Sequence, residues 1–114
     1  NKDLLTKMIT MDEGASYLGE CALVPYDSPI SNSGILFYNT LFDENAACHL
    51  ALGKGFADTI KDFEKYSLDE CRNMGINESM IHVDFMIGCK DLNITAKTRD
   101  RRTVQVFKDG NWAF

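Results

Sequence analysis

A histidine and an aspartate, His82 and Asp84, lie two residues apart in the apolar run from Met80 to Ile87. Alternate side chains of a β-strand point to the same face, so a strand here would present an imidazole and a carboxylate together. Such a pair offers two ligands to one divalent metal or to a close pair of metals. A structural hydrogen bond between the two side chains is the alternative, and the pair alone does not decide between them.

Two further residues offer metal ligands. His49, the only other histidine, lies in the segment from Asp43 to Gly53, which we predict to be a short helix that Asp43 caps and Gly53 ends. Taken alone, it also fits a hydrogen-bonded core histidine. Glu20 directly precedes an apolar, strand-like run, Cys21 to Val24. Burying a carboxylate there costs free energy unless a cation or several donors meet it.

The elements that must position these residues alternate between short helices and short strands. The capping-box pattern of Ser67 and Glu70 opens one helix, and the pair Asp109 and Gly110 predicts a turn. The expected helices cover 1–10, 43–53 and 67–74, the expected strands cover 20–24, 35–38, 80–87, 92–96 and 103–107, and 25–34 is expected to be a loop. Short connections between successive strands favour antiparallel pairing. We therefore predict an α+β fold with a mixed, largely antiparallel sheet and a few short helices.

The composition argues against several classes of protein. The 114 residues carry 17 acidic and 12 basic side chains, a net charge of -5, whereas nucleic-acid binding requires a positive field. The basic run 97–102 is interpreted as a solvated hairpin tip. No apolar stretch has membrane-spanning length, so we expect a soluble domain with no membrane partner. The cysteines Cys21, Cys48 and Cys89 lie in apolar or small-residue surroundings that suit buried, reduced thiols of a cytosolic protein.

Several blocks of the chain together resemble a known family. They are Leu18-Gly19-Glu20, residues 27–30, the stretch from Phe37 to Ala46 with His49, and the stretch from His82 to Gly88. In order and spacing they are similar to the C-terminal part of the thermophilic metalloaminopeptidases, the group of aminopeptidases T and S and PepS. The resemblance covers nearly the whole chain. It implies a cytoplasmic enzyme, expected to be a homodimer, that removes N-terminal residues from peptides.

The resemblance also implies a metal site. The family's ligands for two divalent metals, expected to be zinc, cobalt or manganese, fall on Glu20, His49, His82 and Asp84. Glu20 is also a candidate general base. The family has one further glutamate ligand, well before the position of Glu20, which this chain does not contain. Residues 1–114 are therefore expected to be the C-terminal metal-binding, catalytic region of a larger aminopeptidase, inactive when isolated.

One residue departs from the family pattern. Phe56 lies seven residues after His49, where the family motif carries a tyrosine associated with catalysis. Phenylalanine cannot donate a hydrogen bond to a developing oxyanion, and losing one such donor costs about a hundredfold to a thousandfold in rate. A core position for the Phe56 ring is the other interpretation.

A different class of function is also compatible with these departures. The chain would then be a non-catalytic structural or dimerisation fragment that does not bind metals productively alone. However, such a fragment would have no need to keep two histidines and two carboxylates at the family spacing.

Overall fold

The computed structural model describes all 114 residues, which form two compact units. Unit 1 consists of Asn1–Cys21 and Leu50–Phe85, and unit 2 of Ala22–His49 and Met86–Phe114. Each unit is therefore built from two stretches of chain that are distant in the sequence. No helix is long and apolar enough to cross a membrane.

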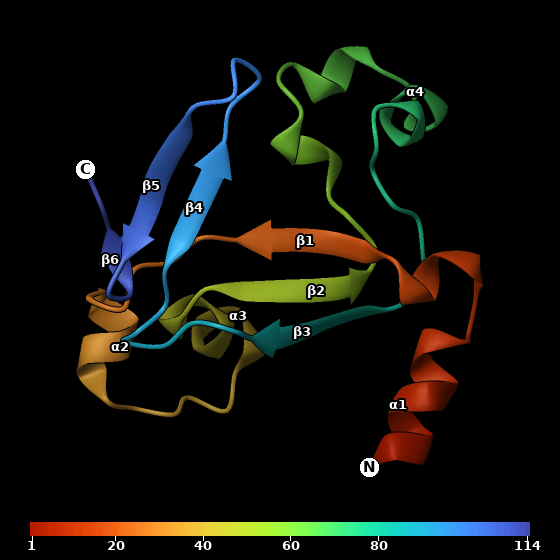
Figure 1. Cartoon of the computed structure of the whole chain (residues 1–114). Helices are drawn as coiled ribbons and strands as arrows, with labels where there is room; N and C mark the ends of the chain where they lie inside the picture. Colours follow the sequence, from red (N-terminus) through yellow and green to blue (C-terminus); the bar gives the residue numbers. More distant parts are fainter. The chain divides into compact units, whose positions relative to one another are not determined.

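One three-stranded sheet contains the candidate ligand residues. Its strands are β1 (Leu18–Ala22), β2 (His49–Gly53) and β3 (His82–Met86), in the order β1-β2-β3. Neighbouring strands run in opposite directions (Figure 1). In β2 buried residues alternate with half-buried ones, which is the period of a strand with one face on the core.

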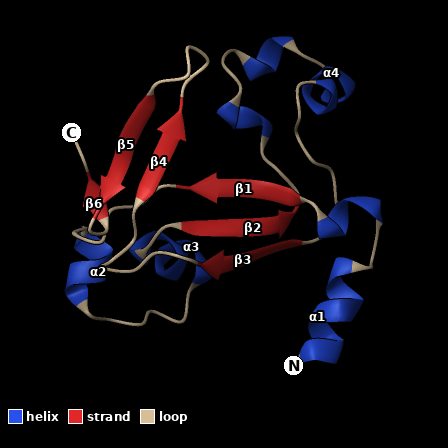
Figure 2. Ribbon diagram, in the orientation of Figure 1, coloured by secondary structure: helices blue, strands red, loops and turns tan.

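The other elements of unit 1 are short helices, drawn in blue in Figure 2. They are α1 (Lys2–Ile9), η1 (Glu13–Ser16), η3 (Ala57–Thr59), η4 (Phe63–Lys65) and α4 (Leu68–Asn73). The capping box of α4 is present, because Ser67 accepts from the Glu70 N–H while the Glu70 carboxylate accepts from the Ser67 N–H. That last bond lowers the pKa of Glu70. The predicted helices at 1–10 and 67–74 are confirmed.

Unit 2 holds the second three-stranded sheet, which is antiparallel. It consists of β4 (Ile94–Lys97), β5 (Thr103–Lys108) and β6 (Asn111–Trp112), in the order β4-β5-β6. Phe107 is fully buried and its ring lies 4.4 Å from that of Trp112. The remaining helices of the unit are α2 (Pro29–Ser33), α3 (Thr40–Asp43) and η2 (Glu44–Ala46). The α+β fold with largely antiparallel sheets is thus confirmed, and so is the hairpin tip between β4 and β5.

Some local predictions were wrong. His49 does not lie on a helix, because helical structure ends at Ala46 and β2 begins at His49. Asp43 does not cap a helix that contains His49. Its carboxylate instead accepts from the N–H groups of Phe37 and Asn39. Those bonds fold 35–38, predicted as a strand, into irregular structure in which Tyr38 has a φ of 53°.

Two other expectations were also wrong: the loop at 25–34 and the burial of two cysteines. The loop expected at 25–34 contains α2, which Ser28 caps and Pro29 opens. Cys48 is buried as expected, and its thiol contacts the backbone N and O of Val24. Cys21 and Cys89 are exposed, contrary to the sequence prediction, although all four cysteines are free thiols.

A carboxylate on the segment before β1 holds the entry to β3. Asp12 Oδ2 accepts from the Met80 N–H at 2.7 Å and from the Ser79 hydroxyl at 3.1 Å. The Met80 bond is the main cause that lowers the pKa of Asp12 below its ordinary value of 3.8. Because Met80 lies two residues before His82, this contact fixes where β3 begins.

We expect Asp12→Ala to lower the thermal midpoint of unfolding by a few degrees at about pH 7. The pKa is depressed in the folded state, so the contribution of Asp12 is present above the unfolded pKa and is lost as the pH falls through the folded pKa. The difference in midpoint between wild type and variant should therefore shrink at about pH 3. Asp91→Ala is the control, since that side chain is exposed. An equal difference at both pH values would contradict the assignment.

Candidate metal centre

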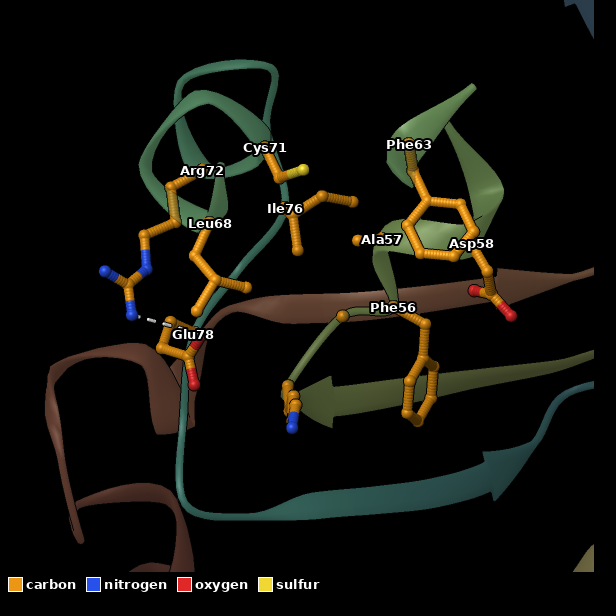
Figure 3. A pocket seen from close by; sticks show the side chains of 11 residues that line it. Phe56, Ala57, Asp58, Phe63, Leu68, Cys71, Arg72, Ile76 and Glu78 are labelled. Carbon is orange, nitrogen blue, oxygen red and sulfur yellow. Dashed lines mark ion pairs between the residues drawn. The ribbon is translucent and has the colours of Figure 1, made fainter. Parts of the chain in front are cut away.

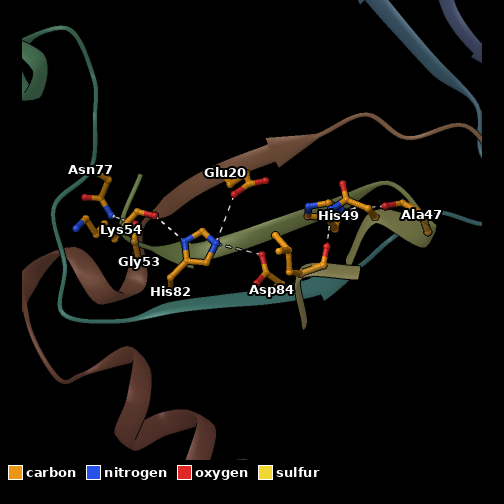
Figure 4. A network of polar contacts seen from close by, with 10 residues as sticks. Glu20, Ala47, His49, Gly53, Lys54, Asn77, His82 and Asp84 are labelled. Atoms are coloured by element: carbon orange, nitrogen blue, oxygen red, sulfur yellow. Dashed lines mark hydrogen bonds and ion pairs between the residues drawn. The ribbon is translucent and has the colours of Figure 1, made fainter. Parts of the chain in front are cut away.

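Three of the predicted ligands come together in unit 1. Glu20 from β1 and His82 and Asp84 from β3 each offer one ligand atom, and these atoms all lie within 4.8 Å of one another. His82 Nε2 is 3.4 Å from Glu20 Oε2 and 3.2 Å from Asp84 Oδ1 (Figure 4). The expectation that His82 and Asp84 share one face of a strand is confirmed.

The orientation of the His82 ring is set by a backbone carbonyl. His82 Nδ1 lies 2.7 Å from the carbonyl oxygen of Lys54 (Figure 4). A carbonyl only accepts hydrogen bonds, so Nδ1 carries the proton. In the neutral ring Nε2 then presents its lone pair toward the two carboxylates. This arrangement, with the far nitrogen donating to a backbone carbonyl, is the one that metal-binding histidines usually adopt.

Glycines make room for the Lys54 carbonyl. A Cβ on Gly19 would lie 2.4 Å from the Lys54 oxygen and 2.3 Å from the Gly53 oxygen. Gly53 has a φ of 98°, and a Cβ there would lie 2.2 Å from the Ile81 oxygen. The Asn77 amide donates to the Gly53 oxygen at 2.6 Å. The backbone next to Glu20 and the backbone next to His82 therefore approach the end of β2 more closely than side chains would allow.

The burial of Asp84 provides a test of whether a cation fits. Its side chain is 8% exposed, compared with 29% for Glu20 and 23% for His82. Asp84 Oδ1 is buried and accepts no hydrogen bond, although His82 Nε2 is close. A buried carboxylate oxygen without a donor is costly. A divalent cation among one imidazole nitrogen and two carboxylate oxygens would satisfy it, and this donor set suits zinc and similar ions.

Phe56 lies directly beside this cluster. Its ring centroid is 5.0 Å from that of His82. The side chain is 45% exposed, so Phe56 is not a buried core aromatic. Together with Glu20, Asp58 and Thr59 it lines a hollow of about 500 Å³. The ring therefore borders both the cluster and a hollow that a ligand could enter.

His49 is the first residue of β2 and belongs to unit 2. The residue is 1% exposed, and its Nδ1 lies 2.9 Å from the Ala47 carbonyl oxygen. Because a carbonyl only accepts hydrogen bonds, Nδ1 carries the ring hydrogen here, as it does in His82. Its membership of the metal site remains a prediction.

Sequence reasoning missed three contributors to the site. Lys54 acts through its carbonyl, and Gly19 and Gly53 act through the absence of a side chain. The glycines were visible as signals, since a glycine inside a strand often marks a close backbone approach. Nothing in the side-chain types of the sequence marks a carbonyl.

Known proteins match this chain along its whole length. The family model described as thermophilic metalloprotease (M29) matches residues 1–112. Aminopeptidase AmpS of Bacillus subtilis is 56% identical over 99% of this chain, and aminopeptidase T of Thermus aquaticus is 43% identical over 97%. The solved structure of wild-type AmpT from Thermus thermophilus superposes with a TM-score of 0.84 at 38% identity and covers 100% of this chain.

The match covers only part of those relatives. The chain spans 28% of the Bacillus protein, 27% of the Thermus aquaticus protein and 28% of the solved chain. The family is nevertheless shown, because the match covers nearly all of this chain. The predicted resemblance is confirmed. Together with the orphaned Asp84 oxygen and the oriented His82 ring, it places the chain in a family of metal-dependent peptidases. This chain belongs to the thermophilic metalloprotease family M29.

Proposed function

We propose that residues 1–114 form the C-terminal, metal-binding region of a longer aminopeptidase that hydrolyses N-terminal residues from peptides. The observation that carries the proposal is the His82 ring, held by the Lys54 carbonyl so that Nε2 faces Glu20 and Asp84. The names of the relatives support the reaction, since they are aminopeptidases.

The proposed ligands are Glu20, His82 and Asp84, with His49 as a fourth. Two divalent ions, zinc, cobalt or manganese, would supply Lewis-acid polarisation of the scissile carbonyl and a lower pKa for an attacking water. The family expectation of two ions rests on these four residues together with one further glutamate, which the resemblance puts well before the position of Glu20. The three residues that cluster supply one nitrogen and two oxygens.

The two carboxylates differ in what they can do. Asp84 is almost buried and does not line the hollow, so we assign it the role of a metal ligand only. Glu20 is more exposed and lines the hollow. A general base must reach the proton that it removes. We therefore assign proton acceptance from the attacking water to Glu20 rather than to Asp84.

The same family resemblance extends the proposal to the whole protein. We propose that the full-length enzyme is cytoplasmic and acts as a homodimer on peptides. Sedimentation of the full-length protein at several concentrations would test the dimer. A monomer at all concentrations would remove that part of the proposal without affecting the metal site.

We expect His82→Ala and Asp84→Asn in the full-length enzyme to weaken zinc binding at least about a hundredfold, because each removes a ligand. Isothermal titration calorimetry of the metal-free enzyme measures the change. Asp62→Asn is a matched control: it also removes one carboxylate of unit 1, at a position with φ 58° that asparagine tolerates. Unchanged affinity in both ligand variants would refute the site.

The 114-residue chain alone is expected to bind zinc weakly and to show no hydrolysis of aminoacyl anilides. An incomplete ligand set fails to fix the metals, so affinity and positioning both fall. The full-length protein, assayed with the same added zinc, cobalt or manganese, is the comparison. Activity of the chain alone that His82→Ala abolishes would contradict the expectation and would mean that these residues suffice.

Phe56→Tyr in the full-length enzyme is expected to raise kcat by up to about a hundredfold to a thousandfold and to change KM less. The new hydroxyl would lie beside the cluster and donate to the oxyanion as it develops. Because Phe56 is 45% exposed, the hydroxyl should not lower the thermal midpoint. Phe85→Tyr is the control, since Phe85 is 41% exposed and alternates with Asp84 on β3. Equal kcat in both variants would show that Phe56 has no catalytic position.

A further inference from the structure

We propose that a second pocket of unit 1 receives the side chain of the first residue of the peptide, and that this side chain is apolar. The inference rests on the proposed function and names its substrate class. The pocket has a volume of about 400 Å³ and lies between α4 and the segment that contains η3 and η4. Figure 3 shows Leu68 and Ile76 on one side of it and Ala57 and Phe63 on the other.

The pocket shares lining residues with the hollow beside the metal cluster. Phe56 and Asp58 line both this pocket and the hollow that contains Glu20. The Phe56 ring also contacts the His82 ring, so one side chain borders the pocket and the cluster at once. An aminopeptidase must hold the first residue of its substrate next to the scissile bond. A pocket that shares a wall with the metal site is therefore in reach of that residue's side chain.

The chemistry of the walls selects an apolar side chain. Phe63, Leu68, Ile76 and Ala57 present carbon to the space, and the buried Cys71 adds a thiol without charge. Ligand pockets of this size are typically lined mainly by apolar groups, with a few polar groups at defined positions. A charged side chain would lose part of its water here, and no net opposite charge of the lining would compensate for that loss.

The charged groups of the pocket do not favour one sign of charge over the other. Arg72 and Glu78 pair with each other at 3.3 Å, and Arg72 also pairs with Asp69 at 2.9 Å. Figure 3 shows the Arg72–Glu78 pair at the side of the pocket. The other two charged lining residues, Lys54 and Asp58, are of opposite sign. The lining therefore carries two positive and two negative groups and has no net charge that would favour an acidic or basic first residue.

The size of the pocket gives the direction of the selectivity. A pocket of about 400 Å³ leaves space around a methyl group, so alanine at the first position would bury little apolar surface. Leucine, methionine or phenylalanine would fill more of it. Each additional methylene in a hydrophobic pocket contributes about tenfold or more to kcat/KM. The expected order is therefore bulky apolar residues first, then alanine, then charged residues.

The test uses two variants of the full-length enzyme with leucyl, phenylalanyl, alanyl, lysyl and glutamyl anilides. Ala57→Phe fills the pocket and is expected to lower kcat/KM for the leucyl and phenylalanyl substrates at least tenfold relative to the alanyl substrate. Leu68→Asp adds a carboxylate at a position that is 70% exposed, so it should fold normally. It is expected to raise kcat/KM for the lysyl substrate at least tenfold relative to kcat/KM for the leucyl substrate. Ala113→Phe, at an exposed alanine of unit 2, is the matched control.

A binding measurement separates this inference from the proposed reaction. In methyl NMR spectra, leucine amide should shift the methyl signals of Ala57, Leu68 and Ile76, and glutamate amide should not. Shifts without any hydrolysis would support the pocket and refute the proposed reaction. Hydrolysis with selectivity unchanged in both variants, and no shifts, would overturn the pocket and leave the reaction standing. Failure of both readouts would overturn both. The inference would also be overturned if the methyl groups of Ala57, Leu68 and Ile76 already contact another segment of the enzyme's own chain in the ligand-free protein, because the pocket would then be filled.

Discussion

The hydrogen bond from His82 Nδ1 to the Lys54 carbonyl is the interaction on which the site depends. Without it the imidazole could rotate or exchange its proton between nitrogens, and Nε2 would no longer be committed to the two carboxylates. The bond is possible only because the end of β2 lies against the start of β3. There the Lys54 N–H donates to the Ile81 carbonyl at 2.7 Å. The strand pairing and the ring orientation are thus parts of one local structure.

The charges of the cluster favour a bound cation. The two carboxylates of the cluster repel each other, and one of their oxygens is buried without a donor. A divalent ion between them would relieve this repulsion and would also use the Nε2 lone pair of His82. The match to a metalloprotease family agrees with a divalent ion at this position.

Sequence patterns predicted the elements with strong local signals and missed those that depend on distant contacts. The capping box at Ser67 and the alternation around His82 each lie within a few residues, so α4 and β3 were predictable. His49 was assigned to a helix because small residues and Gly53 resemble a helix end. What decides is the pairing of β2 with strands far away in the sequence. Within the site, the three clustering side chains were predictable from residue type, but their backbone partner was not.

The use of a carbonyl as the orienting group changes where the sequence is free to vary. Any residue other than proline at position 54 provides the same oxygen and keeps the N–H bond to Ile81, so the lysine side chain there can be replaced without loss of the acceptor. The restriction falls instead on position 19, where even an alanine methyl would collide with that oxygen. Selection on the metal site should therefore restrict the residue type at position 19 on β1, and not the residue type at position 54 that provides the oxygen. A comparison of ligand residues alone would overlook it.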